Sequence, residues 1–244
     1  MIGKQKKNFL KKEGNQWFKR NKSFLSDSTS DSILPFIKDK DKILEIGTSD
    51  GTKLNNILKN LPGYTLDLYG VDPSEKAINS GKDEYPSLKL SIGTSDQLEF
   101  KNNFFNLIIL GSFLYLTDRE LIFKTISEVD RLLKEGGYLV ITDFDTPYPM
   151  KKEYVHSNGI FSYKNNYSSF FLGGFHYSLI KKIPHGFSKN NFDSDMNDRT
   201  SSSVLYKEFY SDIYISNPWK KIIKLDIIFL ARKKFLRLEF HSHF

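Results

Sequence analysis

The sequence predicts an α/β protein built on a doubly wound, mostly parallel β-sheet. Two observations lead to this fold class. Short apolar segments alternate with helical segments between residues 42 and 144, and several of the apolar segments have no polar interruption. Unbroken apolar strands are typical of parallel sheets, because helices cover both faces of such sheets. With 244 residues, the chain is long enough for one such domain with extensions.

Five segments are predicted as strands of this sheet, and they alternate with four predicted helices as βαβ units require. The strands are expected at residues 42–46, 68–72, 88–93, 104–112 and 138–144. In a doubly wound sheet, ligands bind where the strand order reverses. We therefore expect the ligand crevice at the carboxyl ends of strands 42–46 and 104–112.

The predicted helices carry start and stop signals. One is expected over about 51–60, and another begins at Pro73, because proline suits a first helical turn. The clearest helix follows strand 104–112, where Asp118 is expected to cap the start and Gly136 to end it. Its apolar face is formed by Ile122, Ile126, Val129 and Leu133.

Composition excludes several classes of function. The chain has no cysteine, which excludes disulfides, thiolate zinc sites and cysteine nucleophiles, and no metal site is predicted. No apolar run approaches the roughly 18 residues that a membrane helix needs, and the basic N-terminus lacks the apolar stretch of a signal peptide. We therefore expect a cytoplasmic enzyme with no membrane span.

The net charge of +7 is located in residues 1–22, which hold eight Lys or Arg and one Glu. The remaining chain has 28 basic and 28 acidic residues. Residues 4–22 are predicted to be helical, with Phe9 and Trp17 on an apolar side and lysines opposite. Such a helix is either a solvated face or a surface for phosphates or anionic lipids. Residues 1–40 are interpreted as an N-terminal helical arm.

Strand 42–46 is predicted to run into a glycine turn and a helix, an arrangement that binds nucleotide-like ligands through the backbone. A triphosphate loop requires G-x-x-x-x-G-K-[ST]. Here Thr52 precedes Lys53 and Leu54 follows it, so the second glycine and the metal-binding hydroxyl are both missing. The sequence therefore excludes a triphosphate loop.

A dinucleotide site requires glycine at three positions of the turn. These positions hold Gly47, Ser49 and Thr52, so only one of the three is glycine. Asp72 lies where a ribose-binding acid belongs, but such an acid suits any adenosine-containing ligand. The ligand must therefore be inferred from the surrounding motifs.

These motifs resemble those of the class I S-adenosylmethionine (SAM)-dependent methyltransferases over residues 40–145. LEIGTSDG resembles the family's first motif, E-x-G-x-G-x-G, with Ser49 where glycine is usual, and GVDPS resembles the second. GTSDQLEF, FNLIILGSFLYL and LLKEGGYLVITD follow in the family's order, with Asn106 in place of the usual aspartate. SAM has no pyrophosphate, so it does not require the third glycine that this turn lacks.

The resemblance implies a Rossmann-like fold and SAM as the cofactor. It places Asp72 on the ribose hydroxyls, and Thr94 and Ser95 at the adenine. The full set of cofactor-binding residues that it implies is Glu45, Gly47, Ser49, Gly51, Asp72, Thr94, Ser95 and Gly111. EGNQWFKRN, LYLTDR and GIFSYKNNYSSFF further resemble a bacterial subgroup of that superfamily, a likeness that brings no substrate with it.

Residues 146–177 contain nine Phe or Tyr, and we interpret them as an aromatic-rich cap insertion over the acceptor pocket. The alternative is a small satellite core. An aromatic wall suits a small-molecule acceptor, sugar-like or aromatic, methylated at oxygen or nitrogen. Methylation at C5 of a pyrimidine commonly uses a cysteine, which this chain lacks. Two other functions stay open: an RNA methyltransferase that uses the basic arm, and a SAM-binding regulatory domain without catalysis.

A base is needed only if the acceptor must lose a proton early. The candidates near the crevice are Asp143, Asp145, Tyr115 and His156, and His156 is preferred because its unperturbed pKa is nearest to working pH. Water must also be excluded from the reaction. We therefore predict that the basic helical arm is a lid over bound SAM.

The remaining chain completes the domain. Residues 177–183 and 202–209 are predicted to supply the sixth and seventh strands of the sheet, so the methyltransferase domain spans 41–210. Residues 211–244 form an extension of unknown role, for which a strand, a helix for a partner and a homodimer contact all remain open.

Overall fold

The computed structural model describes residues 3–27, 32–174, 176–187 and 191–210. The predicted C-terminal extension, 211–244, lies outside these residues. By its internal contacts, Met1–Glu208 forms one unit, so the N-terminal arm and the sheet belong together. None of the helices in these ranges is long and apolar enough to cross a membrane.

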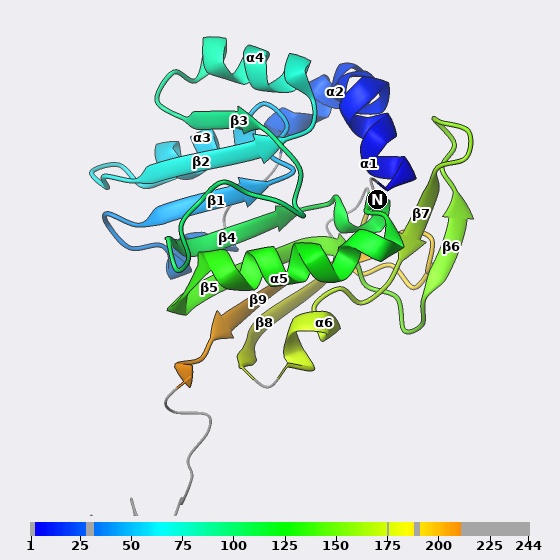
Figure 1. The fold of residues 1–244 in the computed structure, drawn as a ribbon. Coiled ribbons are helices and arrows are strands. Elements are labelled where there is room, and N and C mark those ends of the chain that lie inside the picture. The colour runs from blue at the N-terminus through cyan, green and yellow to red at the C-terminus, as the bar shows by residue number, and fades with distance from the viewer. Residues whose placement is uncertain (1–2, 28–31, 175, 188–190, 211–244) are drawn as a thin grey trace, which may run out of the picture. The chain divides into compact units, whose positions relative to one another are not determined.

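A seven-stranded sheet forms the centre of this unit (Figure 1). The strand order is β3-β2-β1-β4-β5-β9-β8, in which β9 pairs antiparallel with β5 and β8 and the other pairs are parallel. The strands are β1 Lys42–Ile46, β2 Asp67–Asp72, β3 Lys89–Ile92, β4 Phe105–Gly111, β5 Leu133–Phe144, β8 Tyr177–Gly186 and β9 Arg199–Lys207. This confirms the predicted Rossmann-like, doubly wound sheet and its two last strands.

Helices cover both faces of the sheet. On one face, Leu44 of β1 belongs to the same buried cluster as Val129 of α5 (Ile122–Leu132). On the other face, Ile43 belongs to a cluster with Leu54 of α3 (Thr52–Asn60) and Ile78 of α4 (Glu75–Glu84). Successive strand residues point to opposite faces, so the unbroken apolar strands supply both cores.

Two predicted helix boundaries are wrong. Helix α4 begins at Glu75 rather than at Pro73, because the Ser74 hydroxyl accepts a hydrogen bond from the Ala77 N–H and caps the helix. Helix α5 ends at Leu132, and β5 begins at the next residue. Gly136, which was expected to end the helix, lies inside β5 with a φ of +75°.

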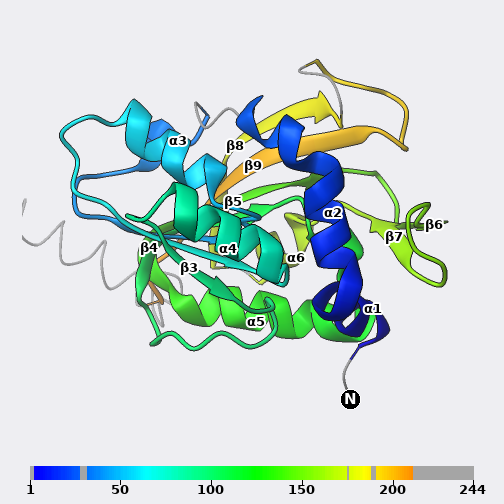
Figure 2. The same ribbon diagram turned by 90° about the horizontal axis from the view of Figure 1, so that it is seen from above.

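The N-terminal arm is helical, as predicted. It consists of α1 (Lys4–Asn8), a π-helical turn (Phe9–Glu13), α2 (Gly14–Asn21) and a 3₁₀ turn (Lys22–Asp27). The arm crosses the end of the sheet toward which β1 and β4 point, in both views (Figures 1 and 2). It therefore lies at the edge where a doubly wound sheet binds its ligand.

The aromatic-rich segment follows β5. It forms the hairpin β6 (Met150–Glu153) and β7 (Phe161–Lys164), and then the short helix α6 (Ser169–Leu172). Tyr167, Phe171 and Tyr177 are buried in the main core cluster. Part of the aromatic excess of residues 146–177 therefore belongs to the core.

Candidate functional site

The floor of the site is the turn between β1 and α3. Gly47 and Gly51 have φ values of +76° and +84°, in the left-handed region that glycine adopts without steric cost. A Cβ at Gly47 would lie 3.0 Å from the Phe113 ring and 3.3 Å from the Gly111 carbonyl oxygen. The absence of a side chain leaves the main chain accessible, which fits a ligand held through the backbone.

Ser49 lies in the same turn and has a φ of +54°. The family that the sequence resembles usually has glycine at this position. Its N–H donates to Asp72 Oδ2 at 2.9 Å, and the residue is 5% exposed. Its Oγ has no hydrogen-bond partner among the described residues. A buried hydroxyl without a partner costs about 1–3 kcal/mol, so Ser49 is a source of strain in the turn.

Glu45 is buried directly below this turn. Its Oε1 pairs with Lys53 Nζ at 2.9 Å, and its Oε2 accepts from the Thr48 hydroxyl at 3.0 Å. These contacts tie the end of β1 to the first turn of α3. Glu45, Ser49 and Gly51 are not among the residues that line the pocket described below, and their direct roles in cofactor binding stay predictions.

Asp72 ends β2 beside the turn. Its carboxylate accepts hydrogen bonds from the Ser49 N–H at 2.9 Å and the Ser74 N–H at 2.8 Å. Burial raises the pKa of Asp72 to about 6, because desolvation outweighs these two hydrogen bonds. The residue lines the pocket, so its carboxylate is available to a ligand with hydroxyl donors.

Thr94, Ser95 and Asp96 follow β3 and line the same pocket. Ser95 Oγ lies 2.8 Å from Thr125 Oγ1, which fixes the segment to α5. Asp96 forms an ion pair with Lys6 of the N-terminal arm at 2.8 Å. Gly111, at the end of β4, completes the group of predicted cofactor residues that the structure brings together.

The roof of the pocket is the N-terminal arm. Lys6, Phe9, Gly14 and Trp17 line the pocket from the arm, opposite Gly47, Asp72 and Gly111 of the floor. Phe113 and Leu116 form an apolar wall on the loop after β4. The space between these residues amounts to about 910 Å³, a volume that includes open solvent at the mouth of the pocket.

The predicted catalytic residues do not line this pocket. Tyr115 is buried in the 3₁₀ turn Leu114–Leu116, and desolvation raises the pKa of its hydroxyl. Asp143, at the end of β5, accepts from the Leu114 N–H at 2.9 Å and the Phe144 N–H at 2.7 Å. Burial raises the pKa of Asp143 to about 7 despite these hydrogen bonds. Asp143 thereby holds the loop that carries Phe113 and Leu116, and the Tyr115 hydroxyl forms a hydrogen bond with the roof residue Trp17.

His156 and Asp145 occupy different environments. His156 is exposed on the segment between β6 and β7, where its ring packs against Tyr154. Asp145 is buried and pairs with Lys182 of β8 at 2.7 Å. The described part of residues 146–177 contributes no lining residue to this pocket, so the aromatic cap over an acceptor stays a prediction.

Sequence reasoning missed several lining residues. The sequence predicted the arm as a lid over SAM and placed Phe9 and Trp17 on its apolar side, but it did not identify either residue as lining the pocket. Asp118 was expected to cap the helix after β4, and this is wrong: its carboxylate makes no cap there and accepts from the Gln5 and Lys6 N–H groups. Contacts over such sequence distances leave no local signal in one sequence.

Comparison with known proteins agrees with this geometry. Residues 43–137 match the family described as a methyltransferase domain. The chain is similar in fold to a SAM-dependent methyltransferase from Methanosarcina mazei (15% identity, 75% of this chain and 99% of that one, TM-score 0.61). No curated protein matches the sequence.

Two further structures are similar in fold. One is the Burkholderia thailandensis 1,6-didemethyltoxoflavin-N1-methyltransferase with bound 1,6-didemethyltoxoflavin and S-adenosylhomocysteine (10% identity, 84% and 87% covered, TM-score 0.61). The other is from a Haloferax volcanii complex between the Trm112 methyltransferase activator and a methyltransferase (16% identity, 82% and 98% covered, TM-score 0.60). Residues 43–137 therefore match a methyltransferase domain, and these solved structures share the fold of the chain.

Proposed function

We propose that this protein transfers the methyl group of SAM to a small-molecule acceptor, at oxygen or nitrogen. The observation that supports this acceptor class is the roof: Phe9, Gly14 and Trp17 line the pocket from the helical arm. A polymer needs an open groove, whereas a roofed pocket admits small ligands. The apolar wall of Phe113 and Leu116 favours an acceptor that is partly apolar, either aromatic or sugar-like.

When bound, SAM supplies an electrophilic methyl group on a sulfonium cation. Asp72 would accept hydrogen bonds from the ribose hydroxyls, and Thr94 and Ser95 would contact the adenine. Gly47 and Gly111, which are half-buried and line the pocket, would lie beside the amino-acid end. The rings of Phe113 and Trp17 offer aromatic faces, which attract cations.

The main catalytic task of these residues is alignment. Holding the acceptor in line with the methyl group contributes several kcal/mol to lowering the barrier (roughly 7–11 kcal/mol at best). The roof residues Phe9 and Trp17 exclude water, which strengthens electrostatic contacts within the site. We propose His156 as the base for a hydroxyl acceptor, because its side chain is exposed whereas Asp143 and Tyr115 are buried behind the wall.

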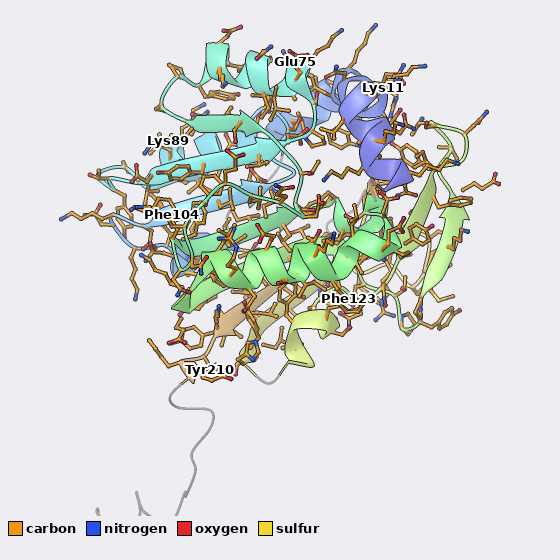
Figure 3. The ribbon with its side chains drawn as sticks, in the orientation of Figure 1. Lys11, Glu75, Lys89, Phe104, Phe123 and Tyr210 are labelled. Carbon is orange, nitrogen blue, oxygen red and sulfur yellow. The ribbon has the colours of Figure 1, made fainter. Side chains whose placement is uncertain are left out.

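Transfer from isotope-labelled SAM to a fractionated cell extract tests the acceptor class. The proposal expects label in the low-mass fraction and none in RNA. Label in RNA would favour the other candidate, in which exposed lysines of the arm bind phosphates. Examples are Lys7 and Lys11, of which Lys11 is labelled in Figure 3. SAM binding without labelling of any fraction would contradict catalysis and favour a regulatory domain.

A role for His156 has a separate test once an acceptor is known. His156→Ala should lower the single-turnover rate by ~10²-fold or more, with unchanged SAM affinity. If His156 is the base, the wild-type pH–rate profile should also have a limb that the variant lacks. An unaltered pH profile with near-normal turnover would leave alignment as the source of catalysis.

A further inference from the structure

The helical arm is attached at its start and at the start of α2, and between them to the segment that joins β6 and β7, where Asn8 Nδ2 donates to Ser157 Oγ at 2.8 Å and the Tyr154 hydroxyl donates to Glu13 Oε1 at 3.2 Å. At its start, the Asp118 carboxylate accepts from the Gln5 N–H at 2.9 Å and the Lys6 N–H at 2.7 Å. Gly3 packs so closely that a Cβ there would lie 2.2 Å from Asp118 Oδ2. These contacts fix the first turn of α1 to the loop after β4, next to the wall residue Leu116.

The Gln5 side chain adds a second tie at the same end. It is 3% exposed, and its amide nitrogen donates to the Leu116 carbonyl oxygen at 2.5 Å. Its amide oxygen accepts from the Phe161 N–H of β7 at 2.8 Å. A buried amide with both groups paired stabilises one arrangement, because breaking either bond leaves a buried polar group unpaired.

The other attachment lies at the start of α2. Asn15 Oδ1 accepts from the Ser74 hydroxyl at 2.8 Å and from the Lys76 N–H at 3.0 Å. Phe18 is buried, and the chain continues from there toward β1. Between the two attachments lies the π-helical turn Phe9–Glu13, followed directly by Gly14. A π-helical turn is an irregular point in a helix and a common feature of functional segments.

We propose that residues 3–13 form a strap that opens at the π-helical turn, and that Asp118, Gln5 and the Lys6–Asp96 ion pair are its latch. The proposal rests on SAM as the ligand of this pocket. Opening of the strap breaks the hydrogen bonds of Asp118 and Gln5 and the bond between Asn8 and Ser157, whereas α2 is also held by the chain that continues into the sheet. The strap admits the cofactor and then covers it with Phe9.

The Lys6–Asp96 pair makes closure of the strap depend on the adenosine half of the cofactor. The two side chains are 19% and 11% exposed, and both residues line the pocket beside Thr94 and Ser95. A ligand that fills this side displaces water from the pair, and a lower local dielectric strengthens an ion pair. Thr94 and Ser95 are the residues assigned to the adenine. Adenosine should therefore close the strap, and methionine should not.

Limited trypsin cleavage after the exposed residues Lys11 and Lys12 measures opening of the strap, because cleavage requires local unfolding. In the wild type, adenosine at about ten times its Kd should slow this cleavage ~10-fold, and methionine should leave it unchanged. Lys6→Met should bind adenosine but lose most of this protection. Lys7→Met, which removes an exposed lysine of the same helix, should keep it.

A second pair of variants tests the latch without ligand. Gln5→Ala should be cleaved faster than the wild type, whereas Gln16→Ala, at an exposed position of α2, should not. Equal cleavage of the two variants, protection by methionine, or full protection of Lys6→Met by adenosine would overturn the strap. Calorimetry with SAM separates the strap from the proposed cofactor site. If SAM binds but does not slow cleavage, the strap alone is contradicted. If SAM does not bind, the cofactor site and the strap are both contradicted.

Discussion

The floor and the roof of the pocket are built in different ways. The floor is the turn around Gly47 and Gly51, whose shape comes from local backbone geometry and from neighbouring strands. The roof is held by side chains from distant parts of the sequence: Gln5 bonds to Leu116 and Phe161, 111 and 156 positions away. The floor is therefore part of the core, whereas the roof is attached through side-chain hydrogen bonds, on which the proposed opening of the strap depends.

The largest effect is expected in the floor. A Cβ at Gly81 of α4 would lie 2.1 Å from the Asp50 carbonyl oxygen in the turn. Gly81→Ala should lower the free energy of unfolding by about 3 kcal/mol, the upper range for overpacking. Gly63→Ala is the control, because Gly63 has a positive φ but no atom near a Cβ, and should cost about 1 kcal/mol. If denaturant titrations show equal losses of unfolding free energy in Gly81→Ala and Gly63→Ala, the turn changes its conformation to accommodate the methyl group and is not rigid.

The next effect concerns cofactor affinity. Asp72→Ala should weaken SAM binding by about 1.5–3 kcal/mol, because a hydrogen bond to a charged group is lost. Asp67→Ala, at the exposed start of the same strand, is the control and should bind normally. Because the pKa of Asp72 is raised to about 6 in the folded protein, wild-type affinity should fall as pH drops below about 6. Calorimetry at several pH values that finds no such fall would exclude an ionised Asp72 from the contact.

A smaller effect is expected behind the wall. The pKa of Asp143 is raised to about 7 by burial, above its ordinary value. The folded protein therefore favours the protonated carboxyl of Asp143, which adds to the free energy of unfolding at low pH. This contribution is lost as pH rises toward 7, because the folded protein must then bury the charged carboxylate. Asp143→Asn should flatten the pH dependence of the free energy of unfolding between about pH 4 and 7. Asp83 is exposed, so Asp83→Asn should leave this pH dependence unchanged. Identical curves for the two variants would contradict the assignment of the pH dependence to Asp143.

The same contrast explains what the sequence could predict. The strands and the glycine turn follow from local periodicity and from residues such as Gly47, and all seven strands were expected. Helix ends were less predictable: the Ser74 cap moved the start of α4, and β5 began at Leu133 before the glycine expected to end α5. The arm was predicted as a lid over the cofactor, but the Asp118 and Gln5 contacts that attach it could not be predicted, because they depend on tertiary packing.

For the site, Gly47, Asp72, Thr94, Ser95 and Gly111 were predicted from motif order, and the structure brings them to one pocket. Their backbone positions follow from the carboxyl ends of adjacent parallel strands. Phe9 and Trp17 were identified only as apolar, because periodicity indicates that a face is covered and not what covers it. Residues that act on an acceptor have even less local signal, so His156 stays a prediction.

The central claim is that this pocket binds SAM, and competitive calorimetry with SAM, S-adenosylhomocysteine, ATP and NAD tests it most directly. We expect SAM and S-adenosylhomocysteine to bind at one site per chain, with affinity reduced in Asp72→Ala and unchanged in Asp67→Ala. ATP and NAD should bind weakly or not at all, because the turn lacks the residues that hold their phosphates. Preferential binding of ATP or NAD, or SAM binding that Asp72→Ala does not affect, would contradict the account.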